Sequence, residues 1–208
     1  MENKKVQSKG LKRRSFIKKS VAASSLFIVP RNVLGGVGYT APSDQLALAA
    51  IGAGGQGAGD ITNATVGGRE RVVALCDVDF SGSASDTVKK FPKAKLYKSF
   101  KKMLDKQKDI DAVTIAIPDH NHAVAASYAM YRGVHVYVEK PLTHNVYEAR
   151  FLTNIARKYK IVSQMGNQGA SNPDQLQIQK WIDNKDIGTI SEVNVWTDRP
   201  VWPSGINK

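Results

Sequence analysis

The sequence lacks the features of proteins that are stabilised by disulfides or by metal ions, and it lacks those of repeat proteins. Its 208 residues include a single cysteine, Cys76, which excludes an internal disulfide and a cysteine-based zinc cluster. That cysteine ends the apolar run R71-V-V-A-L-C76, so we expect a buried, inert thiol. No internal repeat or low-complexity tract is present. With 42% hydrophobic and 23% charged residues, the composition is typical of a soluble globular protein.

Acidic residues are scarce at the amino terminus, and this accounts for most of the net charge of +12. Residues 1–40 hold nine lysines and arginines against one acid, Glu2, so this segment contributes +8 and the remainder +4. A charge of +4 is ordinary for a soluble domain. The sequence shows no RNA-binding signature and no basic patch interleaved with aromatic residues. We therefore predict that nucleic acid is not a partner.

The chain also lacks the run of about 20 apolar residues that spans a bilayer. A shorter run, V21-A-A-S-S-L-F-I-V29, follows the basic stretch K12-R-R-S-F-I-K-K19, and this order is that of a secretory signal. The Arg13–Arg14 pair resembles the bacterial twin-arginine export signal. We assign residues 1–36 to such a signal, with the twin-arginine export machinery as a partner. A disordered basic tail or an amphipathic helix on acidic lipid is the alternative.

This assignment predicts an exported or periplasmic protein without a stable membrane anchor. Because the twin-arginine route moves proteins that are already folded, it favours an enzyme that acquires a cofactor before export. No A-x-A motif marks a cleavage site, and no nearby cysteine could be lipidated.

Behind a connector at residues 37–45, apolar runs and helical patterns alternate. The runs predict strands at residues 46–51, 71–76, 95–97, 111–117, 134–138, 161–165 and 189–196. The helical patterns lie at residues 58–65, 83–91, 99–105, 123–132, 145–159 and 175–183. Asn145 and Glu148 have the spacing of a capping box. Alternating strands and helices with nearly continuous apolar strands predict an α/β fold, a doubly wound parallel (Rossmann) sheet.

The first predicted strand runs into a glycine-rich turn, I51-G-A-G-G-Q-G57. Gly52, Gly54 and Gly57 satisfy G-x-G-x-x-G between a strand and a helix. In this pattern the glycines permit a tight turn, close approach of the backbone to a pyrophosphate, and helix–strand packing. We predict that the turn, including Gly55 and Gln56, binds the phosphates of a dinucleotide at a helix N-terminus.

Asp77 ends the second strand at the spacing expected for an acid that contacts the adenosine ribose. Such a carboxylate accepts hydrogen bonds from ribose hydroxyls and repels a 2′-phosphate. The pattern therefore favours NAD over NADP, although NADP stays open. Asp79 is a rival for the same role.

Two further motifs follow predicted strands and should lie beside the nicotinamide half of a dinucleotide. They are I117-P-D-H-N-H122 and V138-E-K-P-L142. Together with the glycine-rich turn, their order and spacing over residues 46–170 resemble the Gfo/Idh/MocA oxidoreductases. Residues 31–44 and 196–202 resemble an exported bacterial subgroup that acts on sugars.

This resemblance implies an NAD(P)-dependent oxidoreductase that transfers a hydride between a sugar or polyol hydroxyl and a nicotinamide. It implies that Lys140 is catalytic and reaches the reacting hydroxyl, where an ammonium stabilises alkoxide charge and relays a proton. It implies that Glu139 orients this lysine or contacts the cofactor. The other cofactor contacts that it implies are Pro118, His122, Pro141, Asn167 and Gln168.

Other readings of these residues are weaker. His120 and His122 form an H-x-H pair without a carboxylate or cysteine companion, so we predict no metal site. His135 alternates with valines and fits a sheet-face position.

The family has a second, α+β substrate domain that holds an Asp/His acid–base pair. We assign residues 46–170 to the nucleotide-binding domain and residues 171–208 to the incomplete start of the second, with 189–196 as its first strand. No Asp-x-x-x-His pattern follows Lys140. We therefore expect a truncated chain that binds NAD weakly and does not turn over sugar, and a homo-oligomer when full length. The alternatives are an NAD-dependent glycosidase that oxidises its sugar transiently, and a non-catalytic periplasmic binding protein.

Overall fold

A computed structural model describes residues 40–169 and 172–197. Six parallel strands form one sheet in the order β3-β2-β1-β4-β5-β6. The strands are β1 (Ala47–Ile51), β2 (Arg71–Cys76), β3 (Lys95–Tyr97), β4 (Ala112–Ile115), β5 (His135–Glu139) and β6 (Ser163–Gly166). The helices are α3 (Gln56–Ala64), α4 (Ser85–Lys90), α5 (Phe100–Lys106), α6 (His122–Met130), α7 (Val146–Tyr159) and α8 (Pro173–Asp183). Two short 3-10 turns, η1 (Pro42–Asp44) and η2 (Asp119–Asn121), complete the described elements.

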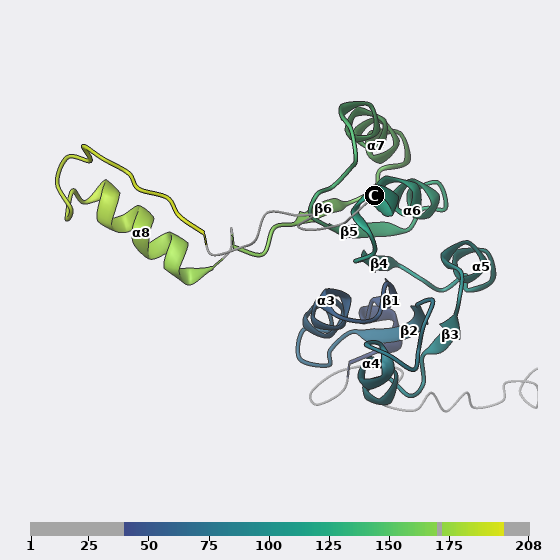
Figure 1. The fold of residues 1–208 in the computed structure, drawn as a ribbon. Helices are drawn as coiled ribbons and strands as arrows, with labels where there is room; N and C mark the ends of the chain where they lie inside the picture. Colours follow the sequence, from purple (N-terminus) through teal and green to yellow (C-terminus); the bar gives the residue numbers. More distant parts are fainter. Residues whose placement is uncertain (1–39, 170–171, 198–208) are drawn as a thin grey trace, which may run out of the picture.

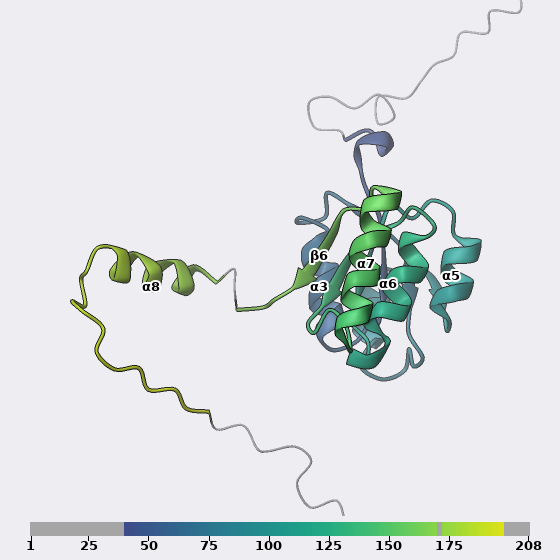
Figure 2. The same ribbon diagram turned by 90° about the horizontal axis from the view of Figure 1, so that it is seen from above.

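Helices cover both faces of the sheet, with α5, α6 and α7 on one face and α3 and α4 on the other (Figures 1 and 2). The alternation of side chains along β1 divides the apolar residues between the two layers. Ala49 and Ile51 pack with the α5–α7 layer. Leu48 and Ala50 pack with Ile61 of α3. The five residues of β1 are all buried, as expected for the centre of a parallel sheet covered on both sides. The predicted doubly wound α/β fold is therefore confirmed.

The strand register brings the carboxyl ends of the strands to one edge. Ile51 pairs with both Cys76 and Ile115, and Ile115 pairs with Val138. The chain moves outward from β1 to β3 on one side and from β4 to β6 on the other. The boundary between β1 and β4 is thus the point where strand order reverses, and ligands of doubly wound sheets bind at this point.

The predicted strands and helices of residues 46–166 are present with small shifts at their ends. The capping box is also present, because Asn145 accepts a hydrogen bond from the Glu148 amide at 2.9 Å. Glu148 in turn accepts from the amide of His144 at 2.8 Å, one residue before the cap.

The strand predicted at residues 189–196 is wrong. This segment has no strand structure, and its residues are exposed. Its alternating pattern suits a strand, but no described strand lies beside it to form a ladder, which a strand needs for stability. The preceding helix, α8, is also exposed along its length and lies apart from the sheet (Figure 1).

Within residues 40–169 and 172–197, no helix combines the length and apolarity that crossing a membrane requires. The proposed export signal at residues 1–36 lies outside the described residues.

Candidate functional site

A cavity of about 620 Å³ opens at the carboxyl edge of the sheet, where strand order reverses. Residues that follow β1, β2, β3 and β4 line it, so it joins segments that are far apart in the sequence. The lining residues are Ile51, Gly52, Gly54, Gly55, Cys76, Asp77, Val78, Ser83, Lys98, Ser99, Phe100, Ala116, Ile117, Pro118 and Asn121. Five of the predicted cofactor residues are among them: Gly52, Gly54, Gly55, Asp77 and Pro118.

The glycine-rich turn is packed tightly around three of its glycines, Gly52, Gly54 and Gly57, where an added Cβ would overlap a neighbouring atom. Gly52 has a φ of +84°, and a Cβ there would overlap the carbonyl oxygen of Ala116 beyond β4. A Cβ on Gly57 would overlap the carbonyl oxygen of Gly52. The turn therefore lies flat against the end of β4, and α3 begins directly behind it. This geometry leaves the start of α3 facing the cavity, as phosphate binding at a helix N-terminus requires.

Asp77 ties the turn to the end of β2. Its Oδ2 atom accepts hydrogen bonds from the amides of Ala53 at 2.8 Å and Gly54 at 3.2 Å, while Oδ1 accepts from the Asp79 amide at 3.1 Å. The carboxylate is thus held in place at the cavity wall.

Asp79, the rival acid, does not line the cavity. Its Oδ1 atom accepts from the amide of Ser81 at 2.8 Å and from its hydroxyl at 2.6 Å, which lowers the pKa of the Asp79 carboxyl. This difference favours Asp77 as the residue that faces an adenosine ribose.

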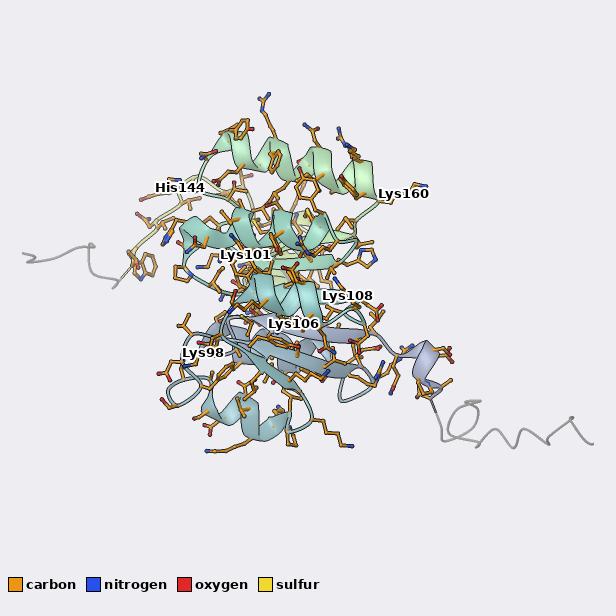
Figure 3. All side chains as sticks on the ribbon, turned by 90° about the vertical axis from the view of Figure 1, so that its right-hand side faces the viewer. Lys98, Lys101, Lys106, Lys108, His144 and Lys160 are labelled. Atoms are coloured by element: carbon orange, nitrogen blue, oxygen red, sulfur yellow. The ribbon has the colours of Figure 1, made fainter. Side chains whose placement is uncertain are left out.

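Several lining residues were missed in the sequence. Lys98, Ser99 and Phe100 follow β3, a weak three-residue strand, and reach the cavity because β3 pairs with β2. In Figure 3 Lys98 and His144 lie toward the carboxyl ends of the strands, and Lys108 and Lys160 lie toward the amino ends. The signal that could have found these residues is the strand order, since all carboxyl ends of a parallel sheet share one edge.

The Glu-Lys-Pro motif lies at the end of β5. The Lys140–Pro141 peptide bond is cis, and the Lys140 side chain is exposed. Its neighbour Glu139 is only 4% exposed, and its Oε1 atom has no hydrogen-bond partner among the described residues. A Cβ on Gly166 of β6 would overlap this Oε1 atom and lie 2.7 Å from the Tyr137 hydroxyl. Glu139 therefore lies against the end of β6, and it does not line the cavity.

Glu139 shares its side of the sheet with two other ionisable groups. Burial, followed by the charges of Glu139 and Asp60, raises the pKa of the Tyr137 phenol. Burial also raises the pKa of Asp60, although a hydrogen bond from Gln56 at 2.8 Å opposes this shift. Gln56 thus turns its amide along α3 toward Asp60.

His122 is almost completely buried, at 1% exposure. Its ring lies between the carbonyl oxygens of Ile117 and Pro141, each 2.7 Å from a ring nitrogen. It therefore joins the loop after β4 to the loop after β5, and it does not line the cavity.

The remaining predicted contacts do not line the cavity. Pro141, Asn167 and Gln168 are exposed at the carboxyl ends of β5 and β6. Their contact with a cofactor stays a prediction. Within the described ranges, no group of three or more His, Cys, Asp or Glu side chains is placed to hold a metal ion.

A doubly wound sheet with a glycine-rich turn, a fixed acid after β2 and a cavity at the switch point defines a dinucleotide-binding domain. The family described as "Oxidoreductase family, NAD-binding Rossmann fold" (Gfo/Idh/MocA) matches residues 46–167. The chain therefore belongs to the Gfo/Idh/MocA oxidoreductase family.

Known proteins of several kinds are similar to this chain. "Glycosyl hydrolase family 109 protein 1" of Bacteroides fragilis is 35% identical over 130 residues, which is 59% of this chain and 28% of that protein. "UDP-N-acetylglucosamine 3-dehydrogenase" of Acidithiobacillus ferrooxidans is 37% identical over 59 residues, 28% of this chain and 19% of that protein. The crystal structure of myo-inositol 2-dehydrogenase from Lactobacillus plantarum superposes with a TM-score of 0.62 at 27% identity. That match covers 70% of this chain and 43% of the dehydrogenase. The chain thus spans less than half the length of each of these relatives.

Proposed function

We propose that this chain forms the NAD-binding part of an oxidoreductase that moves a hydride between a sugar or polyol hydroxyl and a nicotinamide. The observation that supports it best is the cavity at the switch point, with its glycine turn fixed to Asp77. Two observations support this fit: the turn brings backbone without side chains to the cavity, where a pyrophosphate would lie, and the Asp77 carboxylate lines the same cavity, where it would meet a ribose. Bound NAD would supply the hydride acceptor.

In this proposal, different residues along the carboxyl edge of the sheet bind the cofactor and contact the substrate. The turn and Asp77 hold the phosphates and the adenosine ribose, and Ile117 and Pro118 border the nicotinamide. Lys140, exposed at the end of β5, meets the substrate oxygen. Its ammonium would stabilise the negative charge that this oxygen carries once the hydroxyl proton has left, before the hydride passes from carbon to the nicotinamide and the oxygen becomes a carbonyl.

Replacement of Lys140 tests this proposal. In the full-length protein, Lys140→Ala should lower sugar-dependent reduction of NAD by at least about a hundredfold, while the affinity for NADH stays close to that of the unchanged protein. Lys108→Ala removes an exposed lysine at the other end of the sheet and should change neither quantity. Full activity in Lys140→Ala would remove this lysine from the reaction.

A glycosidase is the second candidate, because the Bacteroides fragilis relative carries the name of a glycosyl hydrolase family. In this reaction the same hydride step would be transient, and NADH would not accumulate. A chromogenic glycoside distinguishes the two reactions. Release of the chromophore without net NADH supports the glycosidase, whereas stoichiometric NADH supports the dehydrogenase.

We also propose that residues 1–36 direct the protein through the twin-arginine route. The arrangement of the Arg13–Arg14 pair and the apolar run supports this. Export of a reporter fused to residues 1–40 should stop when both arginines become lysine. Continued export of that variant would contradict the proposal.

A further inference from the structure

The His122 ring occupies a closed position between two loops of the candidate site. Its Nδ1 atom lies 2.7 Å from the carbonyl oxygen of Pro141, and its Nε2 atom lies 2.7 Å from that of Ile117. With 1% of its surface exposed, the ring exchanges neither partner for water. Both nitrogens therefore face groups that can only accept a hydrogen bond.

A neutral imidazole cannot satisfy this arrangement. It has one N–H and one lone pair, so it donates to one carbonyl and turns a lone pair toward the other. Two hydrogen bonds form only when both ring nitrogens carry a proton. Because these bonds have a charged donor, they are stronger than neutral ones. Burial of the ring and the N-terminus of α6, where His122 lies, both oppose a positive charge, and two charge-assisted hydrogen bonds shielded from water act against them.

The two carbonyls belong to the segments that the site depends on. Ile117 lines the cavity beyond β4. Pro141 directly follows Lys140 beyond β5. The pairing of β4 with β5 ends at Ile115 and Val138, so it does not join the two loops that follow these strands. The His122 ring does join them.

We propose that His122 is a positioning residue, held with both ring nitrogens protonated, that fixes the Lys140–Pro141 segment relative to the cavity wall. This role for the lysine rests on the proposed function, but the doubly protonated clamp does not. His122 thereby acts on the reaction through Lys140, without itself touching the cofactor or the substrate.

Nitrogen NMR tests the clamp directly. In protein labelled with ¹⁵N-histidine, the long-range ¹H–¹⁵N spectrum at pH 7.5 separates ring nitrogens that carry hydrogen from those that do not. The chain has four histidines, and the signals that disappear in His122→Gln identify this one. If that variant does not fold, single substitutions of His120, His135 and His144 assign it by elimination. Two N–H nitrogens support the proposal, and one nitrogen without hydrogen overturns it.

Kinetics test the positioning. In His122→Gln the side-chain amide has a donor nitrogen at one position and an acceptor oxygen at the other, so it does not bridge the two carbonyls as the ring does, and kcat should fall by about ten- to a hundredfold. The KM for NAD should stay within about twofold, because Asp77 and the turn are unchanged. His120→Gln is the matched control, an exposed histidine in the same loop. An unchanged kcat in His122→Gln would overturn the positioning role. These kinetics are measured on the full-length protein. If it transfers no hydride, the proposed function fails, and the NMR result still decides the clamp.

Discussion

Gly57 and Gly59, two glycines of α3, have very different surroundings. A Cβ on Gly57 would overlap the carbonyl oxygen of Gly52 and lie 3.1 Å from the Cβ of Ala116. A Cβ on Gly59 would have no neighbour within 4 Å. Alanine at position 57 must therefore push the helix away from the turn, at a cost of about 1–3 kcal/mol. Alanine at position 59 should stabilise the helix by about 0.5–1 kcal/mol.

Urea unfolding of Gly57→Ala and Gly59→Ala measures this difference, and titration with NADH shows whether the binding turn moves with it. We expect weaker NADH binding in Gly57→Ala alone. Equal unfolding free energies in the two variants would show that close helix–turn packing is unnecessary.

Cys76 lines the cavity, but its thiol should be unreactive toward alkylating reagents. Burial, and then the neighbouring Asp77 carboxylate, raise the pKa of its thiol from 9.0 to about 12. At pH 8, iodoacetamide should alkylate it on the order of a hundredfold more slowly in the folded protein than in urea, as mass spectrometry would show. Similar rates in both states would contradict this.

The same pKa sets the sign of a pH effect. Because the folded state holds the Cys76 proton more tightly than the unfolded chain, its contribution to stability is complete below pH 9. This contribution is lost as the pH rises from 9 toward 12. Replacing Cys76 with serine should remove this part of the alkaline loss of stability.

The sequence predicts the relative positions of site residues when these residues belong to one strand–turn–helix unit. Gly52, Gly57 and Asp77 could be read from the sequence because one strand–turn–helix unit fixes their relative positions. The position of His122 between two loops could not, because its carbonyl partners come from different crossover units. Its contact with a cofactor stays a prediction.

At the scale of single elements, α7 depends on its cap. The Asn145 side chain accepts a hydrogen bond from the Glu148 amide, and it precedes a helix of 14 residues. Asn145→Ala should cost about 1 kcal/mol of unfolding free energy. Asn154→Ala, at an exposed position of the same helix, should be neutral or slightly stabilising, since alanine has the higher helix propensity.

Thermal unfolding of both variants gives the comparison. Asn145→Ser retains an acceptor at the cap and should recover most of the loss. If Asn145→Ala and Asn154→Ala unfold at the same temperature, the cap does not contribute to stability.

Strands and helices were predictable in residues 46–166 because helices on both faces of the sheet cover the apolar side chains that the pattern places there. Val136 and Val138 of β5, for example, are buried against α6 and α7. The strand expected at residues 189–196 has the same alternation, yet its apolar side chains remain exposed, Val195 at 90%. Alternation therefore indicates which face a strand would bury, but a neighbouring strand decides whether it forms.

At the scale of the whole molecule, the two apolar layers meet at β1, and the cavity lies at its carboxyl end. A dinucleotide bound there touches residues from both halves of the sheet, those after β2 and β3 and those after β4. Binding should therefore stabilise the described domain as one unit. Ligand at a hundred times its Kd contributes about 2.7 kcal/mol, provided that it binds the folded state alone.

Thermal unfolding with NADH and with NADPH tests both the site and its selectivity. We expect NADH to raise the Tm by about 5–10 °C at saturating concentration, and NADPH to raise it much less. The Asp77 carboxylate should repel the additional phosphate of NADPH, so the Kd for NADH should be lower by at least about tenfold.

Asp77→Asn keeps an oxygen for the Ala53 and Gly54 amides and gives up only the contact with the Asp79 amide. The turn should therefore hold while the preference for NADH shrinks. An unchanged preference for NADH in Asp77→Asn would show that the Asp77 charge does not set the selectivity.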